Sequence, residues 1–126
     1  MQYTVNYDEE LDYIFVRIQG ELSLVTLQDI AMDVAKLVQK TNCHRVLNDL
    51  RQATPVTGAV EIYNMPGTAR QAGVVQWCRR ALVVGDKIGK FRFLETVFIN
   101  QGHIVKVFTD FDEAQNWLCE TDESFG

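Results

Sequence analysis

The stretch RVLNDLRQATPVTG, residues 45–58, holds the side chains whose types and spacing could do chemistry. Asp49 follows the apolar pair Val46 and Leu47, as expected at the carboxyl end of a buried strand. Open α/β sheets bind ligands at that end of their strands, so Asp49 is a candidate general base or phospho-acceptor. A receiver-type phospho-acceptor needs companion carboxylates and a lysine, and no acidic pair ends an earlier strand in that way. We therefore expect Asp49 to accept hydrogen bonds from nearby amides.

Arg51 and two threonines follow in the same stretch. Arg51 is a candidate ligand for an anion, because a guanidinium group can bind a carboxylate or phosphate with two hydrogen bonds. Thr54 and Thr57 are candidates for phosphorylation, and a phosphate on Thr57 would lie at the start of a predicted helix, where amides favour anions. The simpler interpretation, which we favour, makes Thr54 a turn residue and Thr57 a helix cap.

Asp86 and Asp110 also follow predicted strands, so together with Asp49 they could line one edge of the sheet and bind a cation. Both stand where helix caps are expected, and no histidine joins them at ligand spacing. We therefore expect neither a metal site nor a cofactor. The segment GDKIGK, residues 85–90, is not a phosphate-binding loop, because three residues instead of four separate its first glycine from Gly-Lys.

The histidines and cysteines are not expected to do chemistry. His44 and His103 each precede a predicted strand, at the end away from the usual binding edge, so we expect both in solvent-facing loops. Cys43, Cys78 and Cys119 are odd in number and widely spaced, with no CxxC pair. They are expected to be free thiols in a reducing cytoplasm, and none is expected to be catalytic or a metal ligand.

Length and charge restrict the class of protein. The 126 residues are expected to form one domain, residues 1–126, with a frayed tail at 119–126. Apolar residues make up 47 % and charged residues 23 %, an ordinary globular mixture. The formal charge of −5 is dispersed, which argues against a nucleic-acid partner. Neither a signal peptide nor an integral membrane segment is expected from the sequence, so we predict a cytoplasmic protein.

Apolar periodicity predicts the elements that would position these residues. YTVNY and YIFVRIQG are strand-like and flank the polar turn DEELD, which favours a hairpin, and strands then alternate with helices. The predicted elements are strands 3–7 and 13–20, helix 26–40, strand 44–50, helix 57–73 with a break near Pro66 and Gly67, strand 80–85, helix 86–102, strand 104–108 and helix 110–118. Thr26, Asp86, and Asp110 with Glu113 are the expected helix caps, and Gly102 is expected to end a helix.

The order ββαβαβαβα predicts an α/β fold. Alternating strands and helices favour a mixed, mostly parallel β-sheet with an N-terminal hairpin and helices on both faces.

Three segments resemble the SpoIIAA-like group of STAS domains. They are RVLNDLR (45–51), RALVVGD (80–86) and FLETVFINQGHIVKVFTDFDEAQNWL (93–118), and with the order of elements the resemblance covers nearly the whole chain. It implies a regulatory or protein-interaction module that is not an enzyme. In anti-sigma factor antagonists of this group, a phosphorylated serine begins the helix after the equivalent loop, which corresponds to Thr57 and Gly58. The only serines are Ser23 and Ser124, so the usual phosphorylatable residue is absent.

The same fold is similar to lipid-transfer domains of the CRAL-TRIO kind, which implies an alternative function as a carrier or sensor of a small apolar ligand. Tyr63 and Phe93 are then candidates for the pocket wall, although core packing explains most of the aromatic residues. Our first hypothesis is a non-enzymatic module that binds a protein partner or a second copy of itself. The carrier is the second, and a hydrolase or transferase using Asp49 is the third.

Overall fold

The computed structural model describes residues 2–55, 78–100 and 102–120, and these residues form a five-stranded sheet with helices. The elements are β1 (Gln2–Asp8), β2 (Tyr13–Leu22), α1 (Leu24–Thr41), β3 (Arg45–Pro55), β4 (Arg79–Val83), the 3₁₀ turn η1 (Gly85–Lys87), α3 (Ile88–Asn100), β5 (Ile104–Phe108) and α4 (Phe111–Leu118). The predicted helix 57–73 lies outside the described residues.

The strands follow one another across the sheet in chain order, β1-β2-β3-β4-β5. β1 and β2 form an antiparallel hairpin, whereas β2, β3, β4 and β5 run parallel to one another. This confirms the predicted fold class, a mixed and mostly parallel sheet that begins with a hairpin. Among the helices in the described part of the chain, none is long and apolar enough to cross a membrane.

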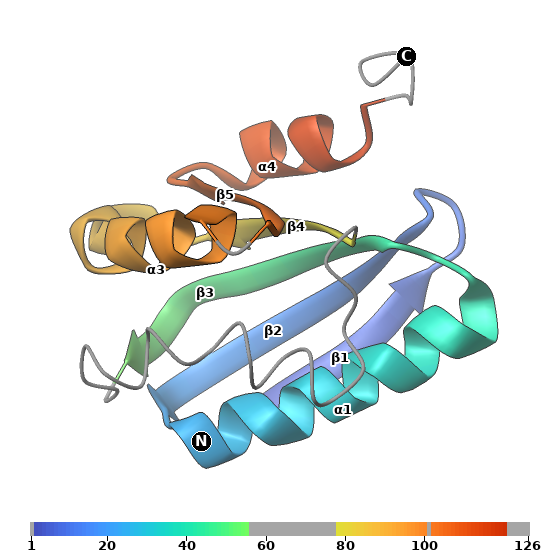
Figure 1. Cartoon of the computed structure of the whole chain (residues 1–126), viewed down its shortest axis with the longest axis horizontal. Helices are drawn as coiled ribbons and strands as arrows, with labels where there is room; N and C mark the ends of the chain where they lie inside the picture. Colours follow the sequence, from blue (N-terminus) through green and yellow to red (C-terminus); the bar gives the residue numbers. More distant parts are fainter. Residues whose placement is uncertain (1, 56–77, 101, 121–126) are drawn as a thin grey trace.

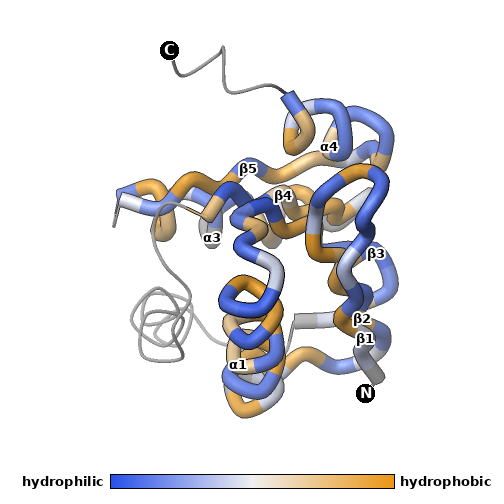
Figure 2. Tube along the Cα trace, turned by 90° about the vertical axis from the view of Figure 1, so that its right-hand side faces the viewer, coloured by the Kyte–Doolittle hydropathy of each residue, from blue (hydrophilic) through white to orange (hydrophobic). Residues whose placement is uncertain are grey.

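Helices cover both faces of the sheet (Figure 1). On one face, α1 and α3 pack against a core that includes Ile14, Val16 and Ile18 of β2. Buried and exposed residues alternate around α1, and Figure 2 shows the same alternation in hydropathy along its turns. On the other face, Ala114 and Leu118 of α4 pack over the strands in a smaller core. Alternate residues of each strand therefore serve different helices.

Helix α4 has only eight residues, so its position depends on packing with the rest of the fold. Arg79 of β4 supplies much of this packing. Its guanidinium carbon lies 4.0 Å from the centre of the Trp117 ring, and its Nη2 donates a 2.7 Å hydrogen bond to the Trp117 carbonyl. At the other end, the Asp110 carboxylate accepts a hydrogen bond from the Glu113 amide at 3.1 Å, which confirms the predicted cap.

Two helix starts differ from the prediction. Helix α1 begins at Leu24, and Ser23 caps it by accepting a hydrogen bond from the Thr26 amide, so Thr26 is inside the first turn. Asp86 is not the cap of α3, because the chain first makes the turn η1 after Gly85 and α3 begins only at Ile88. At α1 a short polar residue just outside the helix sets the start, whereas at α3 the turn η1 comes first.

The predicted end of α3 is confirmed at Gly102. Its φ of +86° allows its amide to bond the Ile99 carbonyl and the His103 amide to bond the Phe98 carbonyl. These two bonds satisfy carbonyls that the last helical turn leaves open.

The largest difference concerns β3. We predicted a strand at 44–50 followed by a loop, but β3 continues to Pro55. Gln52, Ala53, Thr54 and Pro55 pair in parallel with residues Gln19 to Leu22 of β2. Because β2 extends to Leu22, its second half offers backbone groups that the RQATP segment can bond, and this pairing outweighs the local turn preference. Thr54 is therefore an exposed strand residue, and its prediction as a turn residue is wrong.

Candidate functional site

The pairing of β2 and β3 contains a bulge close to Asp49. Asp49 lies opposite Arg17, and the next paired residues are Gln52 and Gln19. Two residues of β3, Leu50 and Arg51, therefore occupy the interval that Ile18 alone occupies in β2. An extra residue of this kind bends the strand and redirects side chains, and bulges are common beside functional sites.

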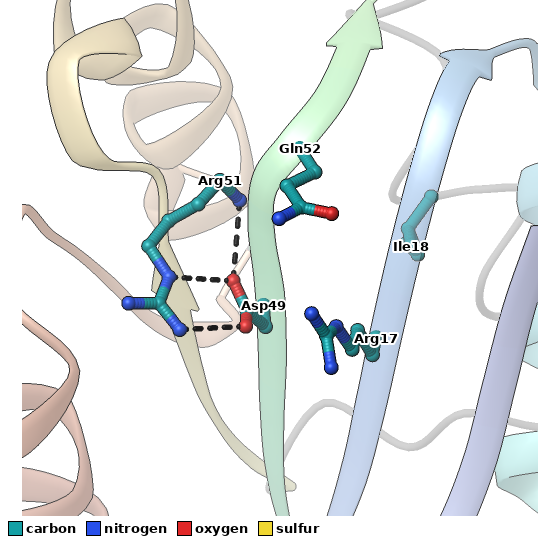
Figure 3. A pocket seen from close by; sticks show the side chains of 5 residues that line it. All are labelled: Arg17, Ile18, Asp49, Arg51 and Gln52. Carbon is teal, nitrogen blue, oxygen red and sulfur yellow. Dashed lines mark hydrogen bonds and ion pairs between the residues drawn. The ribbon is translucent and has the colours of Figure 1, made fainter.

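A pocket of about 240 Å³ lies at this bulge, lined by Arg17, Ile18, Asp49, Arg51 and Gln52 (Figure 3). It lies level with the carboxyl end of β4, since Asp49 pairs with Val83, the last residue of that strand, whereas β2 and β3 continue beyond it to Leu22 and Pro55. Open α/β sheets place their ligands at such strand ends. Four of the five lining residues have polar side chains.

Asp49 and Arg51 form a two-pronged ion pair within the pocket. Nε of Arg51 donates a hydrogen bond of 2.9 Å to Oδ1 of Asp49, and Nη2 donates one of 2.9 Å to Oδ2. The Arg51 backbone amide donates a third hydrogen bond to Oδ1 at 3.2 Å. Asp49 is only 6 % exposed, whereas the Arg51 side chain is 47 % exposed. The pair thus joins a buried anion to a cation that reaches the surface, which confirms that Asp49 accepts a hydrogen bond from a nearby amide.

The charge state of this pair follows from its surroundings. Burial by itself would raise the pKa of Asp49, but the hydrogen bonds from Arg51 and the charges of Arg51 and Arg17 outweigh it, so the pKa is lowered. Hydrogen bonding to Asp49 raises the pKa of Arg51. Asp49 is therefore a bonded, ionised carboxylate, which is a weak general base at neutral pH.

Three elements hold the Arg51 side chain in place. It begins in the bulge of β3, and its Cγ lies 3.5 Å from the position that a Cβ on Gly85 would occupy. Its guanidinium carbon is 5.4 Å from the centre of the Phe111 ring at the start of α4. A long arginine side chain normally loses much freedom on binding a partner, and this positioning reduces that loss.

Arg17 and Gln52 complete the polar rim. Arg17 is exposed and lies near Asp49 across the strand pair (Figure 3). The Gln19 side chain donates a 2.8 Å hydrogen bond to the Gln52 side chain, which links the two strands just beyond the bulge. The rim thus carries two arginines around one buried aspartate, and Asp110 contributes a second negative charge near Arg51.

Comparison with known proteins identifies the fold. No family model and no curated protein matches the chain. It matches the solved structure of an uncharacterised protein of the DUF3478 family with a SpoIIAA-like fold, from Shewanella loihica PV-4, with a TM-score of 0.60. The match covers 93 % of this chain and 94 % of that protein at 14 % sequence identity. The chain has a SpoIIAA-like fold. This confirms the fold implied by the resemblance to SpoIIAA-like STAS domains.

Within the SpoIIAA-like fold, Asp49 and Arg51 are the predicted site residues that come together. Thr54 lies further along β3, opposite Glu21. Thr57 and Tyr63 lie outside the described residues, and so does the side chain of Phe93, whose backbone is in α3.

The three aspartates considered as a cation site do not form one. In the parts of the chain that the structure describes, no three acidic, histidine or cysteine side chains are grouped closely enough to hold a metal ion.

Two pocket residues, Arg17 and Gln52, were not among the site residues predicted from the sequence. Arg17 interrupts an otherwise apolar and aromatic strand, YIFVRIQG, and this was an available signal. Its partner across the sheet is Asp49, but that pairing depends on the register between β2 and β3. Gln52 gave no comparable signal. Its place in the pocket depends on the bulge formed by Leu50 and Arg51 just before it, and that bulge arises from the pairing with β2.

The prediction that both histidines face solvent is wrong. His103 is only 4 % exposed and packs edge-on against Phe98, with ring centres 5.0 Å apart. His44 is partly buried. The turn that ends α3 brings His103 back under the helix, which explains the burial. Position at the amino end of a strand therefore did not predict exposure.

His103 also contacts Arg80, a buried arginine of β4. Nη2 of Arg80 lies at hydrogen-bonding range of His103 Nδ1, and its guanidinium carbon is 5.0 Å from the centre of the Phe98 ring. Arg80 is 8 % exposed, and burial lowers its pKa to about 10. Within the described residues, its Nε has no hydrogen-bond partner. This cation is thus held mainly by ring and histidine contacts.

Proposed function

We propose that this protein is a non-enzymatic module that binds a protein partner, and that the pocket around Arg51 contacts an acidic group of that partner. The observation that carries the proposal is the Asp49–Arg51 pair in the bulge, which fixes a half-exposed arginine side chain at the rim of the pocket. Arginine is enriched among residues that dominate protein interfaces. A guanidinium held before binding also loses less entropy than a free one.

A catalytic role for Asp49 receives no support from its environment. A general base near neutral pH needs a raised pKa, and the pKa of Asp49 is lowered. Its oxygens already accept three hydrogen bonds from Arg51. We therefore retain a structural role for Asp49, the positioning of Arg51.

The proposal also differs from the usual phosphorylation switch. The position that carries the phosphorylated serine in anti-sigma factor antagonists corresponds here to Thr57 and Gly58, and the chain has no serine between Ser23 and Ser124. Recognition through Arg51 needs no covalent modification of this chain. We propose that binding is constitutive, with Thr57 and Thr54 as the positions to check for phosphate.

The alternative function, carriage of an apolar ligand, gains nothing from the pocket at Arg51. Pockets for small molecules usually measure about 300–1,000 Å³ and are mostly apolar. This pocket measures about 240 Å³, and most of its lining side chains are polar. It suits the end of one acidic side chain better than a lipid.

The test is affinity purification of the tagged chain from its own cells, followed by quantitative mass spectrometry. Three variants are compared with the wild type: Arg51→Ala, Arg17→Ala and the control Lys36→Ala. Lys36 is an exposed cation on α1, which covers the other face of the sheet. We expect one or more proteins recovered with the wild type and with Lys36→Ala, and at least tenfold less with each pocket variant.

Arg17→Ala is included because it leaves the Asp49–Arg51 pair intact, so its effect does not depend on the stability of that pair. Equal recovery of the same proteins with all three variants would contradict the proposal. A small molecule that remains bound in native mass spectrometry and is lost on denaturation would favour the carrier instead.

A further inference from the structure

Strand β1 forms one edge of the described sheet. In the described part of the chain it pairs with β2 alone, so one side of its backbone has no neighbouring strand (Figure 1). Proteins usually protect such edges with proline, lysine or a bulge. Gln2–Asp8 contains neither proline nor a basic residue, and its pairing with β2 is continuous from Gln2 to Asp8. Within Gln2–Asp8 the strand is thus regular and carries none of these three protecting features.

The sequence of β1 is nearly symmetric. Its centre reads Tyr3-Thr4-Val5-Asn6-Tyr7, with a tyrosine and then a small polar residue on each side of Val5. If two copies of the strand pair antiparallel about Val5, each Tyr3 faces Tyr7 of the other copy and each Thr4 faces Asn6. Val5 then faces Val5. A two-fold interface requires this kind of self-complementary surface.

Each of the two faces of the strand would continue as one surface across such a pair. Tyr3, Val5 and Tyr7 are partly buried on the α1 side, where they pack against the larger core. Thr4 and Asn6 are exposed on the other side. Tyrosine–tyrosine and threonine–asparagine neighbours across strands both stabilise a sheet, and no like charges face each other in this register.

The tyrosines are already fixed for this role. The Tyr3 hydroxyl donates a 2.7 Å hydrogen bond to Asp33 of α1, and the Tyr7 hydroxyl donates a 2.8 Å bond to Asp12 in the hairpin turn. These bonds hold the rings against the fold and reduce the freedom lost on association.

We infer that β1 pairs antiparallel with β1 of a second copy of this chain, centred on Val5, so that one sheet runs through a two-fold dimer. The free edge of β1 borders the pocket at Arg17, which lies beside Thr4, but the inference does not depend on the proposed partner binding. A single strand pair is a small interface, so the dimer should dissociate on dilution.

The test is sedimentation equilibrium over about 1 to 200 µM chain, with variants that read the register. In Thr4→Glu/Asn6→Glu, each dimer would contain two facing pairs of glutamates, and we expect at least a tenfold loss of affinity. In Thr4→Glu/Asn6→Lys, glutamate at position 4 faces lysine at position 6 of the second copy, and the dimer should return. Thr4 lies beside Arg17 within one chain, so a glutamate there suits the monomer.

The matched control is Thr96→Glu/Asn100→Glu on α3. It makes the same two changes at exposed positions on the helix that packs against β5, the other edge strand. Its dimer should match the wild type. Amide hydrogen exchange of the unmodified chain should also show β1 amides that are better protected at high concentration than at low concentration.

Three results would overturn the inference: a wild-type monomer at every concentration, a dimer that survives Thr4→Glu/Asn6→Glu, or no recovery in Thr4→Glu/Asn6→Lys. If the variants fail to fold, protection of β1 that is independent of concentration would overturn it by itself.

Discussion

At the scale of single residues, the protein holds two buried charged side chains, Asp49 and Arg80, by different means. Asp49 has a cation beside it and three hydrogen bonds, so its charged form is stabilised. Arg80 contacts a histidine and a phenylalanine ring, so burial disfavours its charged form. The two residues should therefore respond in opposite ways to removal of their charge.

Substitution Asp49→Asn should reduce the dependence of stability on acid pH. The folded-state pKa of Asp49 is below its ordinary value of 3.8, so between these two values the unfolded chain binds more protons than the folded chain. The free energy of unfolding must then rise with pH in that window, and the contribution of Asp49 is lost as pH falls through the folded-state pKa. The measurement is the free energy of unfolding in urea between about pH 2.5 and 5. Its increase with pH should be smaller in Asp49→Asn than in the wild type. Equal increases would show that Asp49 is not held in its charged form.

Substitution Arg80→Met should leave stability at neutral pH unchanged or raise it. The change removes a buried cation and keeps an unbranched side chain against Phe98, and replacement of a buried charge by an apolar group is often neutral or stabilising. Thermal unfolding measures the effect. A loss of more than about 2 kcal/mol, far above the usual cost of a well-tolerated core change, would mean that the positive charge of Arg80 is required.

At the scale of the elements, the site depends on how strands end and turn. The bulge inserts Arg51 into β3, and the turn after β4 supplies the surface on which its side chain lies. Gly85 makes this turn with φ of +59°, a conformation that L-residues with a Cβ disfavour.

Substitution Gly85→Ala should lower the free energy of unfolding by about 1–2 kcal/mol, the cost of a left-handed conformation for a residue with a Cβ. An alanine Cβ would lie 3.5 Å from Arg51 Cγ, an ordinary contact, so the loss should come from the backbone. Gly85→Asn should lose less, since asparagine tolerates this conformation better. Urea denaturation of the wild type and the two variants measures both losses of stability. An asparagine variant less stable than the alanine variant would point to crowding at Arg51.

At the scale of the whole molecule, the chain presents two neighbouring surfaces, which meet where Arg17 of the pocket lies beside Thr4 of β1. The pocket at Arg51 faces the α4 side of the sheet, and the free edge of β1 forms one border of the sheet. A partner at the pocket would use the side chains of Arg17 and Arg51, whereas a second copy would use the backbone of β1, so the two contacts use different groups.

Native mass spectrometry of the chain purified from its own cells should therefore give no small-molecule adduct, and a dimer that is lost on dilution. The denatured mass should equal that of the sequence, because the usual phosphorylatable serine is missing. A covalent phosphate that survives denaturation would contradict this and direct attention to Thr57 and Thr54. An adduct lost on denaturation would support the carrier.

The sequence by itself determined the class of fold and most of its elements. The hairpin, the alternation of strands and helices, the cap at Asp110 and the end of a helix at Gly102 all follow from signals within a few residues, namely apolar periodicity and capping chemistry. The same local signals pointed to Asp49 and Arg51.

Only the tertiary structure decided how far β3 extends, where its bulge lies, and that Arg17 and Gln52 join the pocket. It also decided the burial of His103 and Arg80. Each of these depends on pairing or packing between residues far apart in the chain, and the free energy of such contacts overrides local preference.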